Sequence, residues 1–320
     1  MKLTKCVAAV LLMVAAGAVH AQGFPNKPVK IVVPFTAGSA TDILGRTIGQ
    51  KLSEMWGQPV VIDNKPGAGG TIGATLVAKS PPDGYTLLVH SAAQAVNPAI
   101  YPALQYDTEK DFVEVAMLGG QPNVLVVGTA TGFKTVADLI AAAKKAPGQL
   151  NFGSAGIGSG THINGEKFKL AAGIDVMHIP YKGTPEALTE TMTGRITYFF
   201  SPISAALPNV REGKLVALGV STAKRASTLP HVPTIAESGL PGFDYNLWVG
   251  MFAPAGTPND IVEKINADVA RVVQMPDVRE RMAALGAEAM PMTPAEFRRF
   301  MREEIAESAK VVKAAGIKAP

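Results

Sequence analysis

Two loops rich in glycine and hydroxyl side chains hold the residues of this chain that are best suited to binding a ligand. They span residues 34–42 and 153–161, and each joins a short apolar run to a helical pattern. Glycine lets the backbone approach a ligand closely, and free N–H groups at a helix N-terminus favour negative charge. We expect Thr41 to cap the first helix and Thr161 to stand at the start of the second. Two such loops facing one cleft would hold a carboxylate between two helix N-termini.

Each loop alone could equally be the tight turn that any strand-to-helix connection needs. The presence of both in one chain favours an anion site. The residues that we expect to bind the ligand are Phe35, Thr36, Gly38, Ser39, Thr41, Asp42, Ser91, Ser154, Gly156, Gly158, Ser159, His162, Tyr181, Lys182, Gly183 and Ser201.

Several of the polar candidates also have an ordinary structural explanation. Lys182 follows a predicted strand and is either a counter-charge at the cleft or a solvated loop lysine. His162 either donates to the ligand or makes a structural hydrogen bond. Asp42 could accept from an amine, bridge two lobes, or complement the dipole of its own helix. We expect Trp248 to belong to the core and Asn64 to brace the 65–70 turn.

Motifs for catalysis, cofactors and metals give little support for an enzyme. The chain has no G-x-S-x-G, no G-x-x-x-x-G-K-[ST], no H-E-x-x-H and no Cys/His spacing for zinc. The glycines at 153–160 fail G-x-G-x-x-G, because the position of the third glycine is Thr161. Ser221 and Lys224 match S-x-x-K, the motif of penicillin-recognising serine enzymes, without its S-D-N and K-T-G partners. A periplasmic serine acyl-transferring hydrolase using this pair is the alternative function. We expect no cofactor and no metal.

The first 21 residues have the pattern of a secretory signal peptide. Lys2 and Lys5 precede an apolar run over 6–19, and small or compact residues lead up to Ala21, after which we predict cleavage. The run is too short for a membrane span, and no later stretch reaches about 18 apolar residues. The only cysteine, Cys6, lies in this segment. We therefore predict a periplasmic protein without thiol chemistry.

Composition bounds the remaining possibilities. The chain has 320 residues, 47% of them hydrophobic and 18% charged, which is typical of a folded protein with about two domains. Without the two signal-peptide lysines, 30 − 2 = 28 basic residues stand against 26 acidic ones, and no basic stripe is present. A nucleic-acid partner is excluded on these grounds, whereas a small anion needs only a few local donors.

Short β-branched runs alternate with helical patterns, which favours an α/β fold with mostly parallel sheets. Residues 22–121 plus 222–320 are predicted to form lobe 1, and the inserted residues 122–221 to form lobe 2. The predicted strands are 29–35, 60–63, 85–90, 150–152, 177–180, 196–200, 215–220 and 248–252, with two short apolar runs at 113–118 and 124–127. The predicted helices with defined ends are 41–56, 71–79, 136–146, 258–274 and 294–314.

Ordered short motifs over essentially the whole mature chain resemble one family, the solute-binding receptors of tripartite tricarboxylate transporters, often called the Bug family. The motifs are Ile31-Val32-Val33-Pro34-Phe35 with Ala37-Gly38 and Asp42, Asn64-Lys65-Pro66-Gly67-Ala68-Gly69-Gly70, Pro82-Asp83-Gly84-Tyr85-Thr86-Leu87, Tyr106-Asp107, Lys110-Asp111-Phe112, Ala146-Pro147-Gly148, Ser154-Ala155-Gly156, His162, Pro180-Tyr181-Lys182-Gly183, Pro233-Thr234, Glu237-Ser238-Gly239 and Ala253-Pro254-Ala255-Gly256-Thr257-Pro258.

The resemblance implies a two-lobe periplasmic-binding-protein fold of type II with a hinged cleft. It implies a carboxylate ligand held by loops 34–42 and 153–162, partly through ordered water, and the membrane subunits of a transporter as partners of a monomeric receptor. Two positions depart from the family pattern. Ser39 replaces the usual second glycine of the first loop, and Ser201-Pro202 stands where many members carry an acidic residue. The second departure disfavours ligands that carry an amino group.

Overall fold

A computed structural model describes residues 23–318 of the chain, so the predicted signal peptide and its cleavage point lie outside the described residues. Its strands are β1 (Val29–Val33), β2 (Val60–Asn64), β3 (Thr86–Ser91), β4 (Phe112–Gly128), β5 (Asn151–Ser154), β6 (Met177–Pro180), β7 (Tyr198–Pro202), β8 (Leu215–Val220) and β9 (Asn246–Pro254). Its α-helices are α2 (Ala40–Trp56), α3 (Thr71–Ala78), α4 (Ala93–Ile100), α5 (Val136–Lys145), α6 (Gly160–Ala172), α7 (Thr184–Met192), α8 (Ile203–Arg211), α9 (Asn259–Val272), α10 (Pro276–Ala284) and α11 (Pro294–Ala315), with short 3-10 turns at Ala68–Gly70 and Thr129–Thr131.

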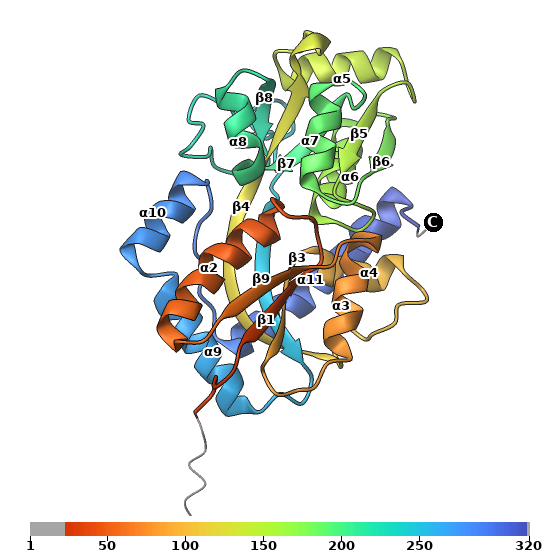
Figure 1. Ribbon diagram of the computed structural model, residues 1–320. Helices are drawn as coiled ribbons and strands as arrows, with labels where there is room; N and C mark the ends of the chain where they lie inside the picture. Colours follow the sequence, from red (N-terminus) through yellow and green to blue (C-terminus); the bar gives the residue numbers. More distant parts are fainter. Residues whose placement is uncertain (1–22, 319–320) are drawn as a thin grey trace, which may run out of the picture.

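The strands form two similar groups joined by strands that run between them. β1 pairs in parallel with β2 and β3, and β5 pairs in parallel with β6 and β7. Between these groups, β9 pairs antiparallel with β3 and β4, and β4 pairs antiparallel with β7 and β8. Figure 1 shows one group with helices α2 to α4 and α9, the other with α5 to α8, and β4 passing from one to the other. Each group is therefore a mixed sheet in which three strands are parallel.

The 17-residue strand β4 replaces the two separate apolar runs expected at 113–118 and 124–127. The sequence suggests that the strand is interrupted at Gly119, Gly120 and Pro122, but these residues lie within β4. The pairing with β9 absorbs them through register shifts between Glu114 and Ala116 and between Met117 and Gly119. The first half of β4 pairs with β9 and the second half with β7 and β8, so this strand belongs to both groups.

Each strand group packs its own hydrophobic core. Ile31, Val33 and Val89 pack beneath α2 and α9 in the first core. Phe152 and Phe168 belong to the second core, on the face of the sheet that α5 and α6 cover. A further hydrophobic cluster lies on the other face of each group. Burying apolar surface is the main stabilising contribution to folding, so separate clusters in each group fit a chain built as two lobes. Within residues 23–318, no helix is long and apolar enough to cross a membrane.

The helix ends follow the local sequence closely where it contains strong signals. Gly57 and Gly173 adopt left-handed φ values of 61° and 58° at the C-caps of α2 and α6. Thr135 and Thr293 form capping boxes at the starts of α5 and α11. The bounds of α4, α7, α8 and α10 were not assigned from the sequence. α4 and α8 contain Pro98 and Pro208, residues that disfavour a helix interior.

Candidate functional site

One small cavity is lined by both glycine-rich loops. It lies where α2 and α6 begin, and its volume is about 20 Å³, which is room for about one water molecule. Among the described residues that line it, none carries an ionisable side chain. The lining residues are Phe35, Ser39, Ala40, Thr41, Ser91, Ala155, Ser159, Gly160, Thr161, Thr184, Pro202 and Leu247.

The first loop presents the N-terminus of α2 to the cavity. Ser39 is the N-cap, with extended φ and ψ of −71° and 163°, so the expected cap at Thr41 is wrong by two positions. The Thr41 side chain lies in the first helical turn, and its Oγ1 is 3.1 Å from Ser39 Oγ. A helix leaves its first four N–H groups without an intrahelical partner, and these point toward its N-terminal end. The α2 terminus therefore offers backbone N–H groups and two hydroxyls to the cavity.

The second loop repeats this arrangement at α6. Ser159 is the N-cap with φ and ψ of −63° and 155°, and Gly160 is the first helical residue, one position before the expected start. Ser159 Oγ lies 3.0 Å from Thr161 Oγ1 and accepts from His162 N–H at 3.3 Å. Thr161 Oγ1 also accepts from Ala155 N–H at 2.9 Å, which ties the helix start to the loop. Both helices thus present the same Ser-x-Thr pair to the cavity.

Asp42 braces the first loop and does not line the cavity. Its carboxylate accepts from Gly38 N–H at 2.9 Å, from Arg46 Nε at 3.0 Å and from Asn64 Nδ2 at 3.0 Å. Burial would raise the pKa of Asp42, but the hydrogen bonds from Arg46, Gly38 and Asn64 outweigh it and hold the pKa below its usual value. Asn64 Nδ2 also donates to Phe35 O at 2.9 Å. Asp42 and Asn64 together therefore fix the path of loop 34–42.

His162 and Ser154 stabilise the second loop from behind the cavity. Gly158 N–H donates to His162 Nδ1 at 3.1 Å. Of the two roles expected for His162, the structure therefore supports the structural hydrogen bond and not the ligand contact. The rings of His162 and His178 stack with centroids 3.8 Å apart, and His178 Nε2 lies 2.6 Å from Ser154 Oγ. Burial, together with electrostatic repulsion from the neighbouring His162, lowers the pKa of His178 to about 2, so this imidazole is neutral at ordinary pH.

The two loops are brought together by direct contacts between the strand groups. Tyr101 Oη donates to Ile157 O at 3.1 Å, and Thr36 Oγ1 donates to Glu186 Oε2 at 3.2 Å. Gly158 has a φ of +82°, and a Cβ there would lie 2.8 Å from Asn97 Oδ1. These contacts, together with the small cavity, describe a closed arrangement of the two halves.

Five of the expected ligand-binding residues line the cavity and eleven lie outside its lining. Lys182 is exposed, and Ser201 is buried with its hydroxyl donated to Pro202 O at 3.2 Å. The five in the lining are Phe35, Ser39, Thr41, Ser91 and Ser159. The eleven outside it are Thr36, Gly38, Asp42, Ser154, Gly156, Gly158, His162, Tyr181, Lys182, Gly183 and Ser201.

The cavity also includes residues that the sequence did not assign to ligand binding. Thr161 repeats the Ser-x-Thr spacing of Ser39 and Thr41, so this pattern could have identified it. Leu247 lies some ninety residues further along the chain, in β9, where no local signal marks it. The other residues missed are Ala40, Ala155, Gly160, Thr184 and Pro202.

The alternative hydrolase requires an accessible nucleophilic serine, and Ser221 is fully buried. Its Oγ donates to Tyr245 O at 2.6 Å and accepts from Asn123 N–H at 2.9 Å. The hydroxyl is therefore engaged with backbone groups where the chain passes between the two halves. This geometry gives Ser221 a structural role and does not support acyl transfer with Lys224.

A two-lobed α/β chain whose halves close over a cavity at two helix N-termini defines a binding protein of the periplasmic type. The model of the family described as "Tripartite tricarboxylate transporter family receptor" matches residues 44–317. The chain belongs to this family, and the resemblance drawn from the short motifs is confirmed.

Solved structures agree in fold over nearly the whole chain. Rpa4515 from R. palustris, solved with adipate, is 38% identical with a TM-score of 0.90, and the match covers 92% of this chain and 100% of that one. The periplasmic binding protein BugD is 32% identical with a TM-score of 0.88, covering 92% and 100%. MatC from Rhodopseudomonas palustris, solved with bound malate, is 36% identical with a TM-score of 0.86, covering 90% and 100%. The predicted two-lobe fold is confirmed by these likenesses.

Proposed function

We propose that this receptor captures a small organic carboxylate in the cavity between α2 and α6. The observation that carries the proposal is the pair of helix N-termini that face one cavity with matching Ser-x-Thr hydroxyls. Helix dipoles and first-turn N–H groups stabilise an anion without a cationic side chain. Related structures with adipate and malate support the same ligand class.

The proposed ligand site is the cavity lining together with the residues that shape the two loops. Ser39, Thr41, Ser159 and Thr161 would donate to the carboxylate directly or through water. Asp42 would act by positioning loop 34–42. Phe35, Pro202 and Leu247 would contact the apolar part of the ligand.

The lobe boundaries that we propose are 22–121 plus 222–320 for lobe 1 and 122–221 for lobe 2. Ser221 bonds to Asn123 and Tyr245 in the region where the chain crosses between the halves, which fits a hinge there. A cavity of about 20 Å³ is too small for a dicarboxylate, so the lobes must separate for the ligand to enter and must then close around it less tightly than in the described arrangement. A ligand that touches both lobes binds the closed state better and shifts the population toward it.

The receptor would deliver its ligand to the membrane subunits of a tripartite transporter, acting as a monomer in the periplasm after cleavage behind Ala21. The family description, which names a transporter receptor, supports this partner. Recognition of the closed shape would let those subunits detect occupancy without any chemical step.

Thermal-shift screening of the mature protein against a panel of carboxylates tests the ligand class. Adipate and malate belong in the panel together with longer, shorter and aromatic acids. We expect at least one acid to raise the melting temperature, and its methyl ester to bind about 100-fold more weakly, because N–H donors to a charge would be left unpaired. Equal affinity for acid and ester would refute the carboxylate proposal.

Solution scattering with and without the identified acid tests closure. We expect the radius of gyration to fall on saturation as the lobes approach each other. An unchanged radius at saturating ligand would refute the hinge while leaving the ligand class intact.

A further inference from the structure

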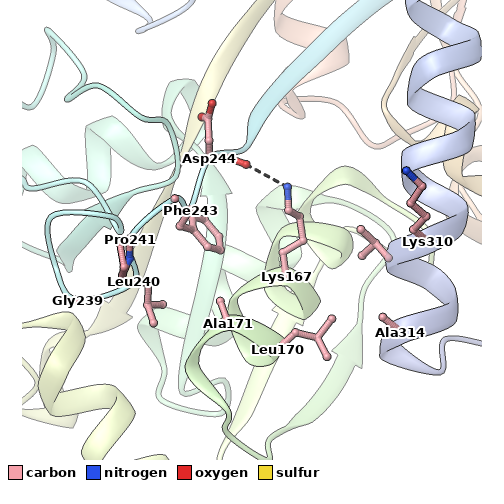
Figure 2. Close-up of a pocket in the computed structure, with 12 residues that line it drawn as sticks. Lys167, Leu170, Ala171, Gly239, Leu240, Pro241, Phe243, Asp244, Lys310 and Ala314 are labelled. Carbon is pink, nitrogen blue, oxygen red and sulfur yellow. Dashed lines mark hydrogen bonds between the residues drawn. The ribbon is translucent and has the colours of Figure 1, made fainter.

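A second and larger concavity lies between α6 and α11, and none of its lining residues belongs to the carboxylate cavity. Its volume is about 700 Å³. In Figure 2, α6 with Lys167 and Leu170 lies between α11, which carries Lys310 and Ala314, and the 239–244 segment on the opposite side. We call this concavity the α6–α11 groove.

Much of the lining of the α6–α11 groove is apolar. Leu170 is 45% exposed there, while Phe243 is buried beneath the groove with only 7% of its surface exposed. Small-molecule sites typically measure about 300–1,000 Å³ and combine an apolar lining with a few polar groups. The groove has the volume and the lining of such a site.

Two lysines and one aspartate supply the charged side chains that line the groove. Figure 2 shows Lys167 and Lys310 on facing helices with their ammonium groups toward the same end of the groove. Lys167 Nζ donates to Asp244 O at 3.0 Å, which uses one of its three N–H donors. The Asp244 carboxylate accepts from Ala223 N–H at 3.0 Å, and Ala223 is not part of the groove lining.

Lys310 is also available to a ligand. It pairs with Glu307 three residues earlier on α11, and the two side chains are 71% and 66% exposed. Exposed pairs of this kind contribute little, because water and salt screen them. An anion that contacts both Lys310 and the less exposed Lys167 would compete with this pair.

We propose that the α6–α11 groove binds an amphipathic organic anion of the medium-chain alkyl carboxylate type. The apolar body would lie along Leu170, Phe243 and Ala314, and the anionic group would lie between Lys167 and Lys310. A neutral molecule of the same length would gain no charge attraction from the two ammonium groups. A short acid would leave the apolar wall exposed to water.

The test uses the fluorescent probe 1-anilinonaphthalene-8-sulfonate, which is apolar and anionic and is too large for a cavity of about 20 Å³. We expect saturable binding to the native mature protein. Octanoate should displace the probe, whereas octanol and acetate should displace it at least tenfold less effectively. A saturating cleft ligand such as adipate should leave the probe bound, which separates this site from the carboxylate cavity.

Matched variants locate the probe. Leu170→Glu should weaken probe binding at least tenfold, and Ala314→Glu on α11 should weaken it similarly. Leu76→Glu is the control, because Leu76 is a helical leucine of similar exposure, 38%, outside the groove. Lys310→Gln should weaken binding about threefold or more, with Lys313→Gln, an exposed lysine of the same helix, as its control.

Four results would contradict the proposal. The first is native affinity in both Leu170→Glu and Ala314→Glu, and the second is an equal loss in Leu76→Glu. The third is displacement of the probe by adipate, which would place the probe in the cleft. Octanol competing as well as octanoate would refute the role of the lysines. Circular dichroism of each variant confirms that the comparison is made on folded protein.

Discussion

Replacing the two N-cap serines separates the contribution of a cap to stability from its contribution to binding. Ser159 Oγ accepts from His162 N–H at 3.3 Å, whereas Ser39 makes no capping hydrogen bond with its side chain. Loss of an N-cap hydrogen bond costs about 1 kcal/mol of folding free energy. Ser159 Oγ lies 3.0 Å from the Thr161 hydroxyl, and Ser39 Oγ lies 3.1 Å from the Thr41 hydroxyl. Both variants lose such a hydroxyl pair, so the effect of this loss on stability cancels when the two variants are compared. Ser159→Ala should therefore lower the free energy of unfolding by about 1 kcal/mol more than Ser39→Ala.

Ligand affinity should respond differently, because both hydroxyls line the cavity. Each substitution removes about 1 kcal/mol of binding free energy, or roughly a fivefold increase in Kd. Urea unfolding without ligand measures stability, and titration calorimetry with an acid found by the thermal screen measures binding. Equal destabilisation by Ser39→Ala and Ser159→Ala would refute the assignment of the caps. Native affinity in both variants would refute the placement of the carboxylate.

Three further results follow from the geometry. Gly160→Ala should weaken ligand binding, measured by calorimetry, because its Cβ would overlap Cδ1 of Leu247, a side chain that lines the cavity. Gly45→Ala in α2 has ordinary contacts from 3.6 Å and should leave binding unchanged. Asp42→Ala should lower the free energy of unfolding in urea by about 2 kcal/mol, because Gly38, Arg46 and Asn64 lose the carboxylate that accepts their hydrogen bonds. The exposed Asp277→Ala should have little effect. Burial lowers the pKa of His90 to about 3, so the folded chain keeps this imidazole neutral while the unfolded chain takes up a proton below about pH 6.5. Stability should therefore fall as the pH drops from about 6.5 toward 3, and His90→Gln should reduce that slope by up to about 1.4 kcal/mol per pH unit; an unchanged slope would contradict the assignment.

The sequence was sufficient to predict the two loops, because their signals are local. A short apolar run, a glycine-rich turn and a following helical pattern define each of them. The N-caps were misplaced by up to two residues because Ser39 and Thr41 are both good capping residues. In the structure the serine is the cap, and the threonine faces its hydroxyl from the first turn.

Features that depend on contacts between distant segments could not be predicted. β4 is one continuous strand because β9 accommodates its two glycines through register shifts, and this pairing joins residues more than 120 positions apart. Leu247 reaches the cavity through the same strand β9. Asp42 was assigned to the ligand because its type suits an anion or cation contact, yet three donors from loop, helix and strand already surround it.

A carboxylate site built from helix N-termini divides the work of recognition between backbone and side chains. The N–H groups of α2 and α6 are present whatever the side chains are, so in the proposed site the fold and the contacts of Asp42 and His162 would set how the anion is held. The rest of the ligand would meet Phe35, Pro202 and Leu247, which carry no charge. Substitutions at these walls should therefore change which acid fits without removing the preference for acids. Relatives solved with adipate and with malate show that acids of different length occur as ligands within this family.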